Sequence, residues 1–308
     1  AIVLNVNDTV ANTYTADVSY TVKNKLTVNN TKPVNGNIAL TAADIPFELG
    51  PGSNHLIAGT WDAGFFGEVP TSEFIAGDEL ASLVGISAGT SQFSNEPWLK
   101  FAYQGNVQFV AKKPFRHSLS WDTLNSANCV YGDKTIQIGE LTYKVRLIRG
   151  ALTDPCKDND ADRGTQGSEW NRLMLPIHVK AKDKSWDYPN YIESDVPYWG
   201  IDYTDTDLHV ASGNGSATWC QETALSNLSN RIYRGQPAIE SSYWVVSDRA
   251  TSFYGWRPVL ELVNSTPTIK EKIDEKLPNS HNTDETAHDD IRQQINSLDA
   301  NGNLKVYK

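Results

Sequence analysis

An acidic segment in the middle of the chain carries oxygen ligands at a spacing that could hold a metal ion. Asp158, Asp160 and Asp162 stand at alternate positions, and Glu169 is the twelfth residue counted from Asp158. This spacing is typical of the calcium-binding loop D-x-[DN]-x-[DN]-G-x5-E, although Arg163 occupies the position of the turn glycine. We predict a candidate Ca2+ site at the four carboxylates, with a solvated acidic loop as the alternative.

A second candidate site combines aromatic rings with carboxylates between positions 186 and 207. Aromatic faces stack on sugar rings, while carboxylates and amides bind hydroxyl groups, so the combination suits a carbohydrate or a protein receptor. The alternative is an aromatic core with polar turns. The residues predicted to bind a ligand are Trp186, Tyr188, Tyr191, Tyr198, Trp199, Asp202, Tyr203 and Asp205.

Combinations of nucleophile and base are scarce in the sequence. It contains neither G-x-S-x-G nor H-E-x-x-H, and its six histidines are isolated. Cys220 with His209 is one conceivable pair, but a buried structural thiol is the commoner state of such a cysteine. Three cysteines do not form a disulfide framework or a zinc motif, although a bridge between Cys156 and Cys220 stays open. We predict that the protein is not an enzyme, while the many carboxylates leave a glycosidase pair as an alternative.

The candidate residues need a scaffold. The sequence of the middle of the chain, residues 46–264, predicts a domain of the α+β class that is dominated by β structure and long loops. Binding residues usually lie on such loops. The predicted strands cover 135–149, 173–179 and 259–263, and the predicted helices cover 72–84, 121–125 and 219–228.

Two further domains are predicted at the ends. Residues 1–45 contain alternating apolar positions and an Asn35-Gly36 turn, which indicate a small β unit that would gain core by trimerising. Residues 265–308 contain apolar positions at helical spacing, including Ile291, Ile295 and Leu298. This last segment is therefore predicted to be helical and to serve in assembly.

Charge and hydropathy exclude two classes of partner. The chain of 308 residues carries a net charge of −10, which would repel the phosphates of nucleic acids and the surface of anionic membranes. No apolar run reaches the length of a membrane-spanning helix, so membrane insertion is not expected.

Several short sequence segments resemble segments of bacteriophage proteins. Residues 25–45 and 281–292 resemble segments of phage tail fibres. Six phrases in order, from Gly-Phe-Phe-Gly-Glu-Val at 64–69 to Tyr-Gly-Trp-Arg-Pro-Val-Leu-Glu-Leu at 254–262, resemble a family of phage virion proteins described as structural or tail proteins. The last phrase also resembles the end of C-type-lectin-like folds, which implies a loop-rich, C-type-lectin-like middle domain.

The resemblance implies a structural protein of the phage tail: a fibre, a fibre base or a receptor-binding component. It would be made in the host cytoplasm, assemble as a homotrimer with other tail or capsid proteins, and reside in the virion. Its ligand would be a host surface glycan or an outer-membrane receptor. The alternatives are an architectural collar, decoration or connector protein, and a tail spike that degrades polysaccharide.

Overall fold

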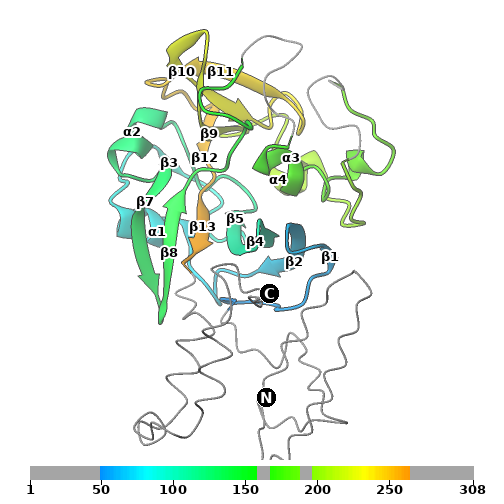
Figure 1. Cartoon of the computed structure of the whole chain (residues 1–308). Helices are drawn as coiled ribbons and strands as arrows, with labels where there is room; N and C mark the ends of the chain where they lie inside the picture. The colour runs from blue at the N-terminus through cyan, green and yellow to red at the C-terminus, as the bar shows by residue number, and fades with distance from the viewer. Residues whose placement is uncertain (1–48, 158–166, 188–195, 264–308) are drawn as a thin grey trace, which may run out of the picture. The chain divides into compact units, whose positions relative to one another are not determined.

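The computed structural model describes residues 49–157, 167–187 and 196–263, and most of their regular structure is β-sheet (Figure 1). The described strands form one sheet of seven and one of six, and the described helices are short. This confirms the β-dominated fold class. The predicted β unit at 1–45 and the predicted helices at 265–308 lie outside the described residues.

The larger sheet is antiparallel at every neighbouring pair. Its last strand in the sequence is inserted between two earlier ones, so the end of the domain lies inside the sheet. The strand order is β1 (Ala58–Gly59), β2 (Ala63–Val69), β4 (Trp98–Tyr103), β5 (Asn106–Ala111), β13 (Val259–Leu262), β8 (Leu141–Arg146) and β7 (Tyr131–Ile138).

The smaller sheet contains one parallel pair, between β9 and β12, and its other pairs are antiparallel. The strand order is β11 (Ser242–Val246), β10 (Asn227–Arg234), β9 (Ala217–Ala224), β12 (Tyr254–Trp256), β6 (Arg116–His117) and β3 (Thr90–Ser91).

The middle strands of the larger sheet are buried on both faces. Successive side chains of a strand point to opposite faces. In β4, Trp98 accordingly enters one hydrophobic core while Leu99 and Phe101 enter a second. The second core also contains Trp170 and lies under the candidate ligand segment. Two cores on one sheet explain why these strands read as continuous apolar runs rather than alternating ones.

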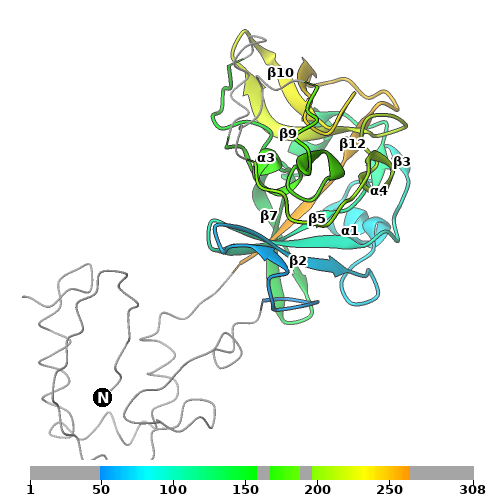
Figure 2. The same cartoon turned by 90° about the vertical axis from the view of Figure 1, so that its right-hand side faces the viewer.

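The helices are short and are mostly capped by side chains. They are α1 (Gly77–Val84), α2 (Trp121–Ser126), α3 (Glu169–Leu173) and α4 (Asp205–Leu208), with the 3-10 helix η1 (Val179–Ala181). The side chains of Ser120, Ser168 and Thr204 accept hydrogen bonds at the starts of α2, α3 and α4. In two views at right angles, α3 and α4 lie between β10 and β2 (Figure 1, Figure 2).

Two of the predicted elements are wrong. The helix predicted near 219–228 is the β9–β10 hairpin, because β9 is a central strand whose nearly continuous burial removes the alternation of a half-exposed strand. The strand predicted at 173–179 is instead the end of α3, a turn and the start of η1. Pro176 interrupts this run, and its apolar side chains are buried in the second core without pairing in a sheet.

The other predicted elements are confirmed in whole or in part. The predicted strands at 135–149 and 259–263 correspond to the β7–β8 hairpin and to β13, and the predicted helix at 121–125 is α2. The helix predicted at 72–84 begins five residues later, at Gly77. Within the described ranges, no helix has the length and hydropathy to cross a membrane.

Both ends of the described domain approach the same strand. A Cβ atom at Gly50 would lie 3.1 Å from the hydroxyl of Tyr143, so the incoming backbone passes the end of a side chain that β8 carries. At the other end, the Val263 amide donates to the Thr142 carbonyl at 2.9 Å. The chain therefore enters and leaves this domain at one place.

Candidate functional site

A long irregular segment between α3 and β9 carries the described members of the predicted ligand site. Its backbone is held at several points: Trp199 N donates to Pro176 O at 3.0 Å, and Tyr203 N donates to Ile177 O at 3.0 Å. Val179 N donates back to Tyr203 O at 2.8 Å. The segment is therefore an anchored loop, the kind of structure on which binding residues are usually presented.

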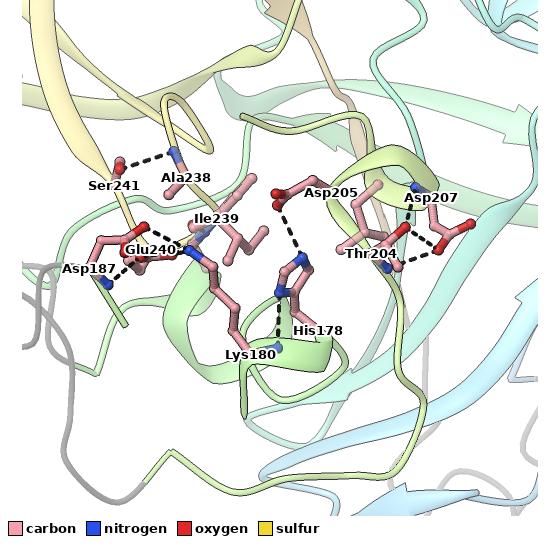
Figure 3. Close-up of polar contacts among 12 residues, drawn as sticks. His178, Lys180, Asp187, Thr204, Asp205, Asp207, Ala238, Ile239, Glu240 and Ser241 are labelled. Atoms are coloured by element: carbon pink, nitrogen blue, oxygen red, sulfur yellow. Dashed lines mark hydrogen bonds and ion pairs between the residues drawn. The ribbon is translucent and has the colours of Figure 1, made fainter. Parts of the chain in front are cut away.

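A buried carboxylate fixes one side of this loop (Figure 3). Glu240, which is fully buried, lies 3.1 Å from the ammonium of Lys180 and accepts the backbone N–H of Asp187 at 2.8 Å. Lys180 also pairs with the Asp187 carboxylate at 2.9 Å. Burial would lower the pKa of Lys180, but its two carboxylate partners outweigh burial and raise it. Lys180 therefore stays charged and connects η1 to the loop.

His178 and Asp205 connect η1 to α4 (Figure 3). The backbone N–H of Lys180 donates to His178 Nδ1 at 3.3 Å, so the ring proton sits on Nε2. Nε2 lies 3.2 Å from Asp205 Oδ1, although the angles are not those of a hydrogen bond. His178 is 1% exposed, and its burial lowers its pKa despite the opposing effect of Asp205. The imidazole is thus neutral near pH 7.

A capping box begins α4. The Thr204 hydroxyl accepts the backbone N–H of Asp207 at 3.3 Å, and Asp207 Oδ2 accepts the Thr204 N–H at 2.8 Å. The Thr204 hydroxyl, which donates to Asp207 Oδ2 at 2.6 Å, and then the Thr204 N–H hold the pKa of the Asp207 carboxyl below its usual value. The box satisfies N–H groups that a short helix leaves open, and it positions the neighbouring Asp205.

Tyr198 and Asp202 form the most exposed part of the predicted site. The Tyr198 side chain is 39% exposed, and its hydroxyl donates to Asp202 Oδ1 at 2.7 Å. This hydrogen bond is the main reason why the pKa of Tyr198 is raised. Asp202 adopts a left-handed backbone conformation, with φ of 56°, which is uncommon for a residue other than glycine.

Tyr203 joins the site to the larger sheet through two residues that the sequence did not indicate. Its hydroxyl donates to Glu68 at the end of β2, and Lys112 lies 4.6 Å above its ring. Lys112 also pairs with Glu68 at 2.7 Å. Burial, and then the hydrogen bond to Glu68, raise the pKa of Tyr203. Glu68 lies 135 positions from Tyr203 in the sequence, and no local spacing could have related the two.

The remaining aromatic residues of the predicted set divide into two groups. Trp186 and Trp199 are partly buried and pack against the second core, so they support the surface from below. Tyr188 and Tyr191 lie outside the described residues. We call Tyr198, Trp199, Asp202, Tyr203, Asp205 and Asp207, together with Glu68 and Lys112, the aromatic–acidic surface.

Glu169, predicted as a calcium ligand, is committed to protein partners. It is fully buried and pairs with Arg146 at 2.7 Å, while Gln108 and the Arg149 N–H also donate to it. Although burial alone would raise its pKa, these partners lower it. Its role is to hold α3 on the larger sheet. Asp158, Asp160 and Asp162 lie outside the described residues, so the calcium site as a set stays a prediction, and the described residues contain no cluster of three metal-binding side chains.

The cysteines and the remaining buried acid do not add a reaction centre to this surface. All three cysteines are buried thiols. Burial raises the pKa of Cys220 well above its ordinary value, and His209 directs Nε2 to the Asn214 carbonyl at 2.8 Å. Glu222 on β9 is also buried and accepts the N–H of Gly150 at 2.9 Å.

The chain matches no protein-family model, no curated protein and no solved structure.

Proposed function

We propose that this chain is a structural protein of a bacteriophage tail, a fibre, fibre base or receptor-binding component, and that it binds the host surface through the aromatic–acidic surface. The ligand would be a surface glycan or an outer-membrane receptor. The activity is binding rather than turnover. The fibre-like phrases at 25–45 and 281–292 and the phage-like phrases between them support this proposal.

One observation carries the binding role. Tyr198 presents an exposed ring whose orientation is restrained by its hydrogen bond to Asp202, on a loop anchored by Glu240 and by the backbone bonds of Trp199 and Tyr203. A ring held in this way can stack on a sugar with little further loss of side-chain entropy, while the adjacent carboxylate accepts sugar hydroxyls.

The fold and assembly that we propose follow from the same resemblance. The domain would be C-type-lectin-like, and its phrase at 254–262 covers β12 and β13, one strand from each sheet. The chain would be a homotrimer in the virion, in contact with other tail or capsid proteins. Three copies of one weak site would give avidity on a surface that repeats the same glycan.

The test compares two exposed tyrosines. Tyr198→Ala should weaken binding of the full chain to host cells about tenfold, the effect of losing ~1.4 kcal/mol of aromatic contact. Tyr131→Ala removes a comparably exposed tyrosine, at 45%, from the opposite edge of the larger sheet and should leave binding unchanged. Binding would be measured with labelled protein over a concentration series.

Two outcomes would contradict the proposal. If the wild-type protein binds no host cells but co-purifies with a virion protein, the role is architectural. If host polysaccharide incubated with the protein is cut into shorter oligosaccharides, the protein is an enzyme.

A further inference from the structure

Lys100 is a buried cation in the middle of the larger sheet. It lies on β4, between β2 and β5, and is 1% exposed. Its ammonium lies 5.3 Å from the ring centroid of Phe66 and 5.7 Å from that of Phe109. Within the described ranges no carboxylate pairs with Lys100, and burial lowers its pKa to about 8. Keeping a cation from water in this way is costly, so the groups that Lys100 binds need an explanation.

Lys100 binds the first described segment of the chain, residues 49–54, which we call the entry strap. Its Nζ donates to Gly50 O at 3.3 Å and to Asn54 Oδ1 at 3.2 Å. These two acceptors lie near the two ends of the entry strap, while residues 52–54 are exposed. One ammonium group therefore ties both ends of an exposed segment to the centre of the sheet.

Two glycines allow the entry strap to lie directly on the sheet. Gly50 and Gly52 have left-handed backbones, with φ of 74° and 76°. A Cβ atom at Gly52 would lie 2.5 Å from Val69 Cγ2, and one at Gly50 would lie 2.9 Å from Phe109 Cζ. The entry strap thus covers Val69, which is 1% exposed.

A hollow beside the entry strap leaves it room to move. The hollow measures about 410 Å³ and lies between Pro51 and the turn from β7 to β8, with Phe74 and Tyr143 among its lining residues. On this side the strap is therefore not packed against the turn. Opening would also return the Lys100 ammonium to water, which offsets part of the apolar contact that is lost.

We propose that the entry strap opens independently of the two hydrophobic cores, that Lys100 is the positioning residue that keeps it closed, and that its opening uncovers Val69 and Phe109. The strap is the segment through which residues 1–48 join the domain, so a pull on those residues acts on it first. It would couple an event in the preceding chain, such as assembly, to the exposure of apolar surface. This inference is independent of the ligand in the proposed function.

The experiment measures how fast a thiol beneath the entry strap reacts in the full chain. Val69→Cys places that thiol under Gly52, while the native thiols of Cys129, Cys156 and Cys220 are buried and report opening of the cores. Labelling with a maleimide, followed by mass spectrometry of the peptides, gives a rate for each thiol. The introduced thiol should react at least about tenfold faster than the native ones, because local opening breaks fewer contacts than unfolding of a core.

Lys100→Met in the same background tests what keeps the strap closed. Methionine keeps an apolar stem but donates no hydrogen bond, so the thiol at position 69 should react about tenfold faster again, while the native thiols keep their rates. Asn54→Ala removes one of the two acceptors and should act in the same direction, which decides the question if Lys100→Met does not fold. Lys144→Met, at an exposed position on β8, is the matched control and should have no effect.

Three results would overturn the inference. If the thiol at position 69 reacts no faster than Cys129, the entry strap does not open by itself. If Lys100→Met accelerates all four thiols equally, Lys100 stabilises the whole fold rather than the strap. If neither Lys100→Met nor Asn54→Ala changes the rate at position 69, other contacts keep the strap closed.

Discussion

Glu222 shows how strongly a single enclosed group can couple folding to pH. Burial raises its pKa to about 8, although the N–H of Gly150 partly opposes this. In the unfolded chain the pKa of a glutamate is 4.5. Between these two values the folded protein holds a proton that the unfolded chain has lost, so the free energy of unfolding should fall as pH rises from 4.5 to 8.

Replacing Glu222 by glutamine should remove most of this dependence. Glu222→Gln keeps an oxygen for the Gly150 N–H and carries no charge, so the variant should gain stability relative to wild type by up to ~1.4 kcal/mol per pH unit between pH 5 and 8. Urea unfolding at both pH values measures the difference. Glu140→Gln, at the exposed turn between β7 and β8, is the control. A gain that is equal at both pH values would refute the assigned pKa shift.

For individual residues, the sequence indicated which aromatic and acidic side chains lie in one segment, but not which partners fix their positions. Tyr198 and Asp202 are four positions apart, and their composition alone suggested a polar aromatic site. Glu68 lies on β2 and Lys112 directly after β5, and only the fold brings them to Tyr203. Glu169 fitted a calcium spacing because spacing does not reveal the buried Arg146 that binds it.

Among the secondary structure elements, α4 should depend on its cap. Thr204→Ala removes the hydroxyl that accepts from Asp207 and should lower the free energy of unfolding by about 1 kcal/mol. Because Asp205 and Asp207 lie on this helix, the same change should also weaken ligand binding. Thermal unfolding gives the first quantity, and the host-cell titration gives the second.

The matched control lies in the same helix. Thr206 is exposed and follows Asp205, and the capping box does not include it. Thr206→Ala should therefore leave both quantities nearly unchanged. Equal losses in the two variants would mean that the helix tolerates loss of its cap.

A half-exposed hairpin was predicted correctly because its pattern is visible in the sequence. Exposed positions alternate along β7 with positions that are partly or fully buried, and that alternation is visible in the residue types. Strand β9 is buried at seven of eight positions and was mistaken for a helix, since a central strand loses the period of two. The strand prediction at 173–179 was wrong for a related reason. The apolar residues at 173–177 fill the second core from a turn, and a turn gives no periodic pattern by which it could be told from a strand.

For the whole molecule, the prediction taken from the sequence is trimeric assembly. Light scattering on the full chain after size-exclusion chromatography should give three times the chain mass of 34.1 kDa. The reason is that the N-terminal unit predicted at 1–45 is too small to bury an adequate core alone. A stable monomer at micromolar concentration would contradict the fibre interpretation.

Gly50 lies against the side chain of Tyr143 and Val263 is hydrogen-bonded to Thr142, both on β8, and this has a consequence for how such a protein can diversify. A module whose entry and exit lie together can be exchanged for another, or shuffled between parent genes, without displacing the segments on either side. If the proposed function holds, exchanging this domain alone would change which host surface the protein binds.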